Sequence, residues 1–139
     1  MASRRKSREL ALQMLFQWEV GHHPPAEVVR NFLRSQRIDV EEESFARTLF
    51  EGTVSEIRQI DNLVRGQSEN WRPERMAAVD RSILRVALYE LLYHPETPAA
   101  VVINEALEIA RRFSGEDSVE FVNGVLDGIR KNLPTAKTS

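Results

Sequence analysis

The sequence predicts an all-α protein of about seven helices. Apolar residues recur three and four positions apart through most of the 139 residues, which is the spacing that gathers side chains on one face of an α-helix. Strict alternation of apolar and polar residues, which is typical of a half-buried strand, does not occur over any convincing stretch. Glycines and prolines fall between the periodic segments, where they end one helix and permit the next to begin.

The first helix is expected over about residues 7–20. Gly21 is expected to end it in the left-handed conformation that glycine accepts, and the prolines after Gly21 cannot continue the hydrogen-bond ladder. A shorter second helix should begin near Pro25 or Ala26, because the missing N–H of proline does no harm in a first turn, and it should fray by Gln36.

A long third helix is expected from Asp39 to about Gly66. Asp39 and Glu42 have capping-box spacing, in which each side chain accepts a hydrogen bond from the backbone N–H of the other residue. Glu41 and Glu43 add negative charge to the first turn, where the helix dipole favours it, so the acidic run is interpreted as a complement to the dipole. The buried stripe of this helix is expected to comprise Phe45, Leu49, Ile57, Ile60 and Val64.

Polar residues 67–72 interrupt the pattern and mark the best candidate for a boundary between two subdomains. The length of 139 residues is that of a single domain, with one core or two small cores. The expected subdomains are residues 1–68 and 69–134, and a disordered tail is expected over 135–139.

The next helices have clear start signals. A brief helix is expected from Pro73 to Ala78, and a longer helix with Asp80 as its N-cap follows it. The sixth helix should take Thr97 as its N-cap and Pro98 as its first residue.

The chain turns sharply between the sixth and seventh helices. Gly115 is expected as the C′ residue of the sixth helix, and Asp117 or Ser118 as the N-cap of the seventh. Gly124 and Gly128 lie four residues apart inside the last helix, where each costs about 1 kcal/mol relative to alanine. This spacing favours a face that another backbone approaches closely, although simple tolerance of glycine explains it as well.

Composition excludes several kinds of chemistry. The chain has no cysteine for disulfides, thiolate zinc sites or nucleophiles, and no apolar run approaches membrane-spanning length, so we expect a soluble, cytoplasmic protein. The six scattered glycines form no phosphate-binding string, and the adjacent His22 and His23 lie far along the chain from His94. We therefore expect no cofactor, no metal and no enzymatic activity.

The N-terminal residues carry the clearest binding chemistry. Four cations gather there before the first acidic residue, namely Arg4, Arg5, Lys6 and Arg8. Gln13 and Phe16 follow on the first helix, and cations for phosphates, an amide for base edges and an exposed ring for stacking are what single-stranded RNA recognition uses. Because the formal net charge of the chain is −2, any such contact must be local. The alternative is a short basic start that only keeps the terminus solvated.

Several separated blocks, taken in order, resemble the NusB family. They comprise the basic start with Glu9-Leu10-Ala11, the segment from Val79-Asp80-Arg81 to Glu90-Leu91, Ile103-Asn104-Glu105-Ala106 and, above all, Phe121-Val122-Asn123-Gly124-Val125-Leu126. The resemblance implies two small three-helix-type bundles packed together. It also implies a role in transcription antitermination. Members of the family pair with NusE, a small-subunit ribosomal protein, bind the boxA element of nascent ribosomal RNA transcripts and help RNA polymerase, with other Nus factors, to resist termination.

The resemblance further implies which residues bind. The RNA-binding set would comprise Arg4, Arg5, Lys6, Arg8, Gln13, Phe16, Phe113, Asp117, Ser118 and Phe121, and the NusE-binding set Glu74, Asp80 and Arg85. A carboxylate at Asp117 can accept from a base amino group, but N-cap roles explain Asp117 and Asp80 almost as well. Arg85 could be a solvated helix residue. Phe16, where many relatives have tyrosine, keeps the stacking face and loses a hydroxyl donor.

Two other functions stay open. A NusB-like domain also occurs fused to ribosomal RNA cytosine methyltransferases, so the chain could be an RNA-binding accessory domain. A helical protein-interaction scaffold with no RNA role is the alternative of another class. The sequence leaves open whether the protein is a monomer or a homodimer, and which RNA sequence it prefers.

Overall fold

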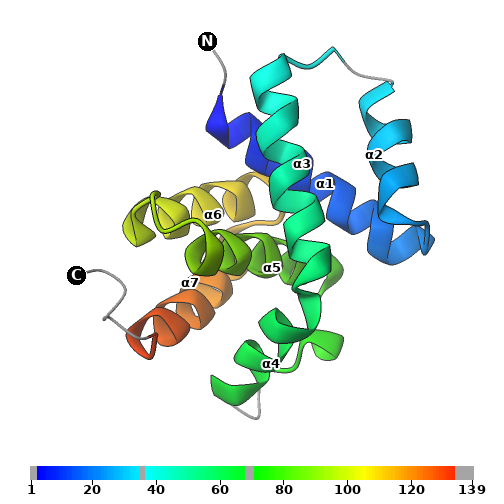
Figure 1. Ribbon diagram of the computed structural model, residues 1–139. Coiled ribbons are helices and arrows are strands. Elements are labelled where there is room, and N and C mark those ends of the chain that lie inside the picture. Colours follow the sequence, from blue (N-terminus) through cyan, green and yellow to red (C-terminus); the bar gives the residue numbers. More distant parts are fainter. Residues whose placement is uncertain (1–2, 35–36, 68–70, 134–139) are drawn as a thin grey trace. The chain divides into compact units, whose positions relative to one another are not determined.

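The computed structural model describes residues 3–34, 37–67 and 71–133, and this part of the chain contains helices and no strand (Figure 1). The expected all-α class is confirmed. In chain order the elements are α1 (Arg4–Gly21), α2 (Pro25–Arg34), α3 (Val40–Ser55), α4 (Ile57–Gln67), the 3-10 helix η1 (Pro73–Arg75), α5 (Ala78–Tyr93), α6 (Ala99–Phe113) and α7 (Glu116–Lys131). Gln36 and the tail 135–139 lie outside the described residues.

The chain forms two compact units, residues 1–56 and 57–139. The first contains α1, α2 and α3, and the second contains α4 to α7 with η1. The division falls after Glu56, whereas polar residues 67–72 predict a boundary one helix later. The packing of one bundle on the other stays a prediction.

In the first unit, α1 packs along α3, and α2 contacts both helices. The largest fully buried side chains of this unit are Leu10, Met14, Leu15, Leu49 and Phe50. The helix α1 begins at Arg4 rather than Ser7 because the Ser3 hydroxyl accepts a hydrogen bond from the Lys6 backbone N–H at 3.1 Å.

The prediction that Gly21 ends α1 in the left-handed conformation is wrong. Gly21 is the last helical residue, and His22 takes the left-handed conformation, with φ at 59°, while its N–H donates to the Trp18 carbonyl at 3.0 Å. Histidine is among the non-glycine residues that tolerate this region. A Cβ at position 21 would lie 2.8 Å from the His23 ring, so a larger residue there would require this exposed side chain to move.

Asp39 caps α3 as expected, because its carboxylate accepts from the Glu41 backbone N–H at 2.9 Å. The reciprocal half of the capping box is wrong. The Glu42 carboxylate instead accepts from the Ser3 backbone N–H at 2.7 Å, and the Glu42 carbonyl accepts from the Ser7 hydroxyl at 2.9 Å. These bonds attach the start of α1 to the first turn of α3.

The prediction of one helix from Asp39 to Gly66 is also wrong, because Glu56 separates α3 from α4. Just before the break, the Thr53 hydroxyl donates to the Leu49 carbonyl at 2.6 Å. Hydroxyl bonds of this kind bend helices. The break follows three residues after Thr53.

In the second unit, α5, α6 and α7 pack on one another, and α4 contacts α5 and α7. The residues that fill its core include Leu84, Leu88, Val102, Ala110, Leu126 and Ile129. Among the expected N-caps, Thr97 is wrong by one residue, because the Pro98 carbonyl accepts the first bonds of α6 from Val101 and Val102.

The prediction that Asp80 caps α5 is wrong as well. Ala77 is the N-cap, and Asp80 lies inside the first turn. The Arg81 guanidinium donates to the carbonyls of Pro73 and Met76 at 2.8 and 2.7 Å. These two bonds fix the turn between η1 and α5, so hydrogen bonds from an arginine of α5 back to this turn, rather than a capping side chain, hold the start of α5.

A single glycine joins α6 to α7. Gly115 follows the C-cap Ser114, as expected for a C′ residue, and it is also the N-cap of α7 with φ at 144°. This conformation favours glycine. The prediction that Asp117 or Ser118 caps α7 is therefore wrong, since both already lie in its first turn.

The two glycines inside α7 have different surroundings. A Cβ at Gly124 would have no neighbour within 4 Å in the described part of the chain, apart from its own helix, so simple tolerance explains this glycine. A Cβ at Gly128 would lie 3.1 and 3.3 Å from two carbons of the Trp71 indole. The close approach expected at this face therefore occurs at one glycine, and a side chain rather than a backbone makes it.

We predict that Gly124→Ala raises the free energy of unfolding by about 1 kcal/mol, because alanine is the better helix former and meets no neighbour. Gly128→Ala is the matched variant. It gains the same propensity but must displace Trp71, so its gain should be smaller or reversed. Urea denaturation of both variants measures the difference. Equal gains at the two positions would contradict the packing of Trp71 on α7.

Candidate nucleic-acid interface

The N-terminal cations lie at the start of α1. Arg4, Arg5 and Lys6 are exposed, and the first turn holds no acidic residue of its own. Cations at a helix N-terminus oppose the helix dipole, so this placement costs stability. A local conflict of this kind is typical of residues retained for binding.

Two of the four predicted cations contact an aromatic ring of α3. The Arg4 guanidinium carbon lies 3.8 Å from the centre of the Phe45 ring, and that of Arg8 lies 5.8 Å from it. Arg8 is only 7% exposed. Phe45 therefore holds Arg4 in a stacked position, and Arg8 is available to a ligand far less than Arg4.

The remaining α1 residues of the predicted set share a different side of the helix. Arg5 and Phe16 are separated by three helical turns, and Lys6 and Gln13 by two turns, so the four lie on one side. Gln13 is half-buried, and Phe16 is 36% exposed. The first unit thus brings two cations, an amide and an aromatic ring onto one side of α1, and two more cations onto Phe45.

The corner between α6 and α7 presents an aromatic ring to solvent. Phe113 is 40% exposed, and the guanidinium carbon of Arg112 lies 5.6 Å from its ring centre. Arg111 donates to Glu108 on α6 and to Glu116 on α7, and these hydrogen bonds raise the pKa of the Arg111 guanidinium, that to Glu116 most. Through these bonds, Arg111 with Glu108 and Glu116 holds the end of α6 to the start of α7.

The other predicted residues of this corner lie along α7. Asp117 is exposed, whereas Ser118 and Phe121 are half-buried. Asp117 and Phe121 are four residues apart and therefore share a helix face. Asp117 is not the N-cap of α7, and its negative charge in the first turn is favoured by the helix dipole. A contact of Asp117 with an amino group stays a prediction.

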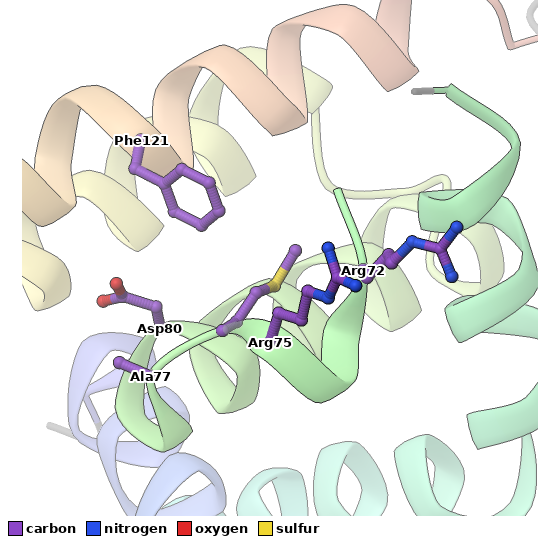
Figure 2. Close-up of a pocket in the computed structure, with 6 residues that line it drawn as sticks. Arg72, Arg75, Ala77, Asp80 and Phe121 are labelled. Carbon is purple, nitrogen blue, oxygen red and sulfur yellow. The ribbon is translucent and has the colours of Figure 1, made fainter. Parts of the chain in front are cut away.

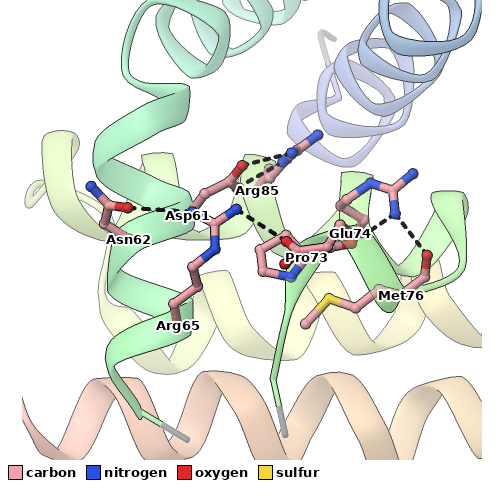
Figure 3. A network of polar contacts seen from close by, with 8 residues as sticks. Asp61, Asn62, Arg65, Pro73, Glu74, Met76 and Arg85 are labelled. Atoms are coloured by element: carbon pink, nitrogen blue, oxygen red, sulfur yellow. Dashed lines mark hydrogen bonds and ion pairs between the residues drawn. The ribbon is translucent and has the colours of Figure 1, made fainter. Parts of the chain in front are cut away.

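The predicted partner-binding residues differ in how accessible they are. Asp80 is half-buried, and Figure 2 shows its carboxylate below the Phe121 ring. Glu74 is exposed and pairs with Arg65 at 3.0 Å (Figure 3). A backbone hydrogen bond and the Arg65 contact lower the pKa of the Glu74 carboxyl, so Glu74 stays ionised to a lower pH than a free glutamate.

Arg85 is committed to an internal ion pair. Its guanidinium donates twice to the Asp61 carboxylate, at 2.9 and 2.7 Å (Figure 3). The two side chains are 11% and 13% exposed. The alternative that Arg85 is merely solvated is therefore wrong, and the pair joins α4 to α5.

The predicted RNA-binding residues fall into two groups, one in each unit. The residues from Arg4 to Phe16 belong to the first unit and those from Phe113 to Phe121 to the second. That the two groups form one surface stays a prediction. The sequence reading missed Phe45 and Arg112, because an aromatic in an apolar stripe and an arginine in a last helical turn both have ordinary structural explanations.

Within residues 3–34, 37–67 and 71–133, no three histidine, aspartate or glutamate side chains gather as metal ligands would. None of the described helices is both long and apolar enough to cross a membrane.

Comparison with known proteins points to one family. A profile of the NusB family matches residues 5–131. The transcription antitermination protein NusB of Koribacter versatilis is 53% identical over 133 residues, which cover 94% of this chain and 90% of the relative. That of Solibacter usitatus is 46% identical and covers 96% of this chain and 92% of the relative.

Solved structures agree with this match. The structure of NusB from T. maritima has a TM-score of 0.88 and 34% identity, with 99% of each chain covered. A structure of the antitermination factors NusB and NusE in complex with double-stranded RNA has a TM-score of 0.86, with 94% of this chain and 97% of that chain covered. At 23% identity, the second likeness concerns the fold alone.

Proposed function

Because the chain belongs to the NusB family, we propose that it is a transcription antitermination factor that binds boxA RNA of nascent ribosomal RNA transcripts together with NusE and helps RNA polymerase, with other Nus factors, to resist termination. The observation that carries this proposal is the 53% identity to a transcription antitermination protein over 94% of the chain. The protein acts by binding and is not an enzyme. Bacterial transcription takes place in the cytoplasm, and we place the protein there.

We assign the RNA contacts to the residues that the two units expose. Arg4, Arg5 and Lys6 hold phosphates, and Phe16 offers its ring to a base beside Gln13. Arg8 adds charge to this group, although its burial against Phe45 gives it a supporting role.

The corner of the second unit supplies the remaining contacts. The exposed Phe113 ring stacks on a base, and Arg112 beside it contributes positive charge. Asp117 and Ser118 offer hydrogen-bonding groups in the first turn of α7, and Phe121 offers a second ring on the face of Asp117.

A protein partner makes physical sense for such a surface. About four cations on a single strand give a salt slope near −3, which corresponds to weak binding by this chain alone. NusE, bound to the same RNA, adds its own contacts and raises the joint affinity through effective concentration. We assign NusE binding to the surface around Glu74 and Asp80. Arg85 supports that surface through its pair with Asp61.

Two alternatives remain as outcomes of experiment. One is an RNA-binding accessory domain of a ribosomal RNA methyltransferase, and the other is a scaffold without an RNA role. Both named relatives are transcription antitermination proteins, at 53% and 46% identity, which favours an antitermination factor over the other two functions.

The test is the electrophoretic mobility of boxA RNA with this protein, with NusE, and with both. We expect a weak shift with either protein alone and a much stronger joint shift, which should disappear with a boxA RNA of scrambled sequence. The solution mass of the protein, measured alongside, reports whether a homodimer competes with RNA binding. Absence of any joint shift would contradict the proposed function and favour the scaffold.

A further inference from the structure

The start of α1 is held by the first two turns of α3, the helix on which α1 packs in the first unit (Figure 1). Glu42 makes two of the contacts: its carboxylate accepts from the Ser3 backbone N–H at 2.7 Å, and its carbonyl accepts from the Ser7 hydroxyl at 2.9 Å. Phe45 makes the third, since the Arg4 guanidinium carbon lies 3.8 Å from its ring centre. One turn of α3 therefore fixes both the backbone at the start of α1 and the side chain of its first residue.

Phe45 differs from the other aromatic residue of α3. Phe50 is fully buried, as a core residue should be, whereas Phe45 is only half-buried, although its place in the apolar stripe predicts burial. The guanidinium carbons of Arg4 and Arg8, one turn apart on α1, lie 3.8 and 5.8 Å from the Phe45 ring centre. The ring thus serves two arginine side chains rather than the core alone.

The contact between Arg4 and Phe45 is compatible with phosphate binding. A guanidinium that stacks on an aromatic ring uses its planar face, and its N–H donors point outward from the edge of that plane. A phosphate accepts two parallel hydrogen bonds from such an edge. Because the Arg4 side chain is exposed, it can bind a phosphate without leaving the ring.

The ring also lowers the entropic cost of that binding. An unrestrained arginine side chain has many rotamers and loses this freedom when a ligand immobilises it. In the unbound protein, Phe45 already restricts the Arg4 side chain, and the Ser3 cap fixes the helix from which Arg4 projects. Arg4 therefore has less freedom left to lose when it meets a phosphate.

We propose that Phe45 is a positioning residue for RNA binding. Its ring holds the Arg4 guanidinium with the donor edge toward solvent, so that the contact with a phosphate is preformed. Phe45 acts through Arg4 and needs no contact with the RNA itself. This inference rests on the proposed function and adds to it, because the predicted RNA contacts belong to α1, α6 and α7 and none belongs to α3.

The first experiment is a double-mutant cycle on the binding of boxA RNA in the presence of NusE. It compares the wild type with Arg4→Ala, Phe45→Leu and the variant that carries both changes. Phe50→Leu is the matched control, because it makes the same change in the same helix at a core position. Phe45→Tyr keeps the aromatic face and tests whether the ring itself is needed. Urea denaturation checks the folding of each variant.

We expect Phe45→Leu to weaken joint binding about threefold, which is the factor that a cation–π contact at an exposed site contributes. Arg4→Ala should weaken joint binding about fivefold at about 0.1 M salt and lower the salt slope by about 0.7. Phe45→Leu should leave the slope unchanged, since Arg4 keeps its charge. The double variant should bind no more weakly than Arg4→Ala alone. Phe45→Tyr and Phe50→Leu should bind as the wild type does.

A pair of lysine variants tests the same contact without altering α3. Arg4→Lys and Arg5→Lys both keep the positive charge and replace a planar guanidinium by an ammonium group. Both residues are exposed, so both variants should fold even if Phe45→Leu does not. Arg5 lies on a different side of α1 from Arg4. We expect Arg4→Lys to weaken joint binding about threefold more than Arg5→Lys does, because only the first change also removes the stack on Phe45.

Three results would overturn the positioning role and leave the proposed function standing. If Phe45→Leu weakens binding equally in the wild type and in Arg4→Ala, the ring acts independently of Arg4. If Phe50→Leu weakens binding as much as Phe45→Leu, the effect is one of helix packing. If Arg4→Lys and Arg5→Lys lose equal affinity, the stack has no part in RNA binding. Failure of the wild type to bind boxA RNA with NusE would overturn the proposed function and the positioning role together.

Discussion

A variant with Arg4, Arg5 and Lys6 all replaced by alanine is expected to bind boxA RNA about 100-fold more weakly at about 0.1 M salt. Each cation on a phosphate of single-stranded RNA adds about 0.7 to the slope of log affinity against log salt. Three contacts therefore contribute about 2 to this slope. At about 0.1 M salt, that contribution corresponds to a factor of about 100 in affinity. These residues are exposed, so their loss should leave circular dichroism helical. Titrations at several salt concentrations, with NusE present, measure both quantities.

The matched control replaces three other exposed cations of the first unit, Arg30, Arg34 and Arg37, by alanine. Both triple variants remove three positive charges and take the formal net charge from −2 to −5. If the N-terminal cations bind phosphates directly, only the first variant loses slope. Equal losses in both variants would reduce the effect to long-range charge, and an unchanged slope in the first would remove Arg4, Arg5 and Lys6 from the RNA contacts.

Helical periodicity predicted most of the elements, because an amphipathic stripe is a property of consecutive residues. The C′ role of Gly115, the N-cap role of Asp39 and the start of α2 at Pro25 were also local and were correctly predicted. The misplaced helix starts have different causes. The early start of α1 follows from the cap by Ser3, whereas near Asp80 the Arg81 bonds to Pro73 and Met76 fix the turn that precedes the helix.

The candidate site was predictable only in part, because residues far apart in the sequence form it. A cluster of cations and its exposed position follow from the sequence alone. The bond from Ser3 to Glu42 spans 39 residues, and the stacking of Arg4 on Phe45 depends on the same packing of α1 along α3. A pocket lined by Asp80 and Phe121 likewise combines residues from η1, α5 and α7, which no local pattern connects.

Replacing Asp61 or Arg85 singly is expected to lower the free energy of unfolding by about 2–3 kcal/mol. Breaking a fully buried ion pair costs about 3–5 kcal/mol, because the remaining charge stays buried without its partner. The two side chains are 11% and 13% exposed, so water relieves part of that cost. Urea denaturation of Asp61→Ala and Arg85→Met measures the effect. The exposed pair of Arg65 and Glu74 is the control, and Arg65→Ala should cost less than about 1 kcal/mol.

The double variant Asp61→Leu with Arg85→Met separates stability from partner binding. Apolar replacement of both members of a buried pair is often neutral, so the double variant should recover most of the stability that each single variant loses. If Arg85 only supports the surface around Glu74 and Asp80, a stable double variant binds NusE as the wild type does. If the stable double variant fails to bind NusE, Arg85 contacts the partner directly, and the ion pair in the free protein must open on assembly. Single-variant losses below about 1 kcal/mol would show that the pair is not the joint between α4 and α5 that its geometry indicates.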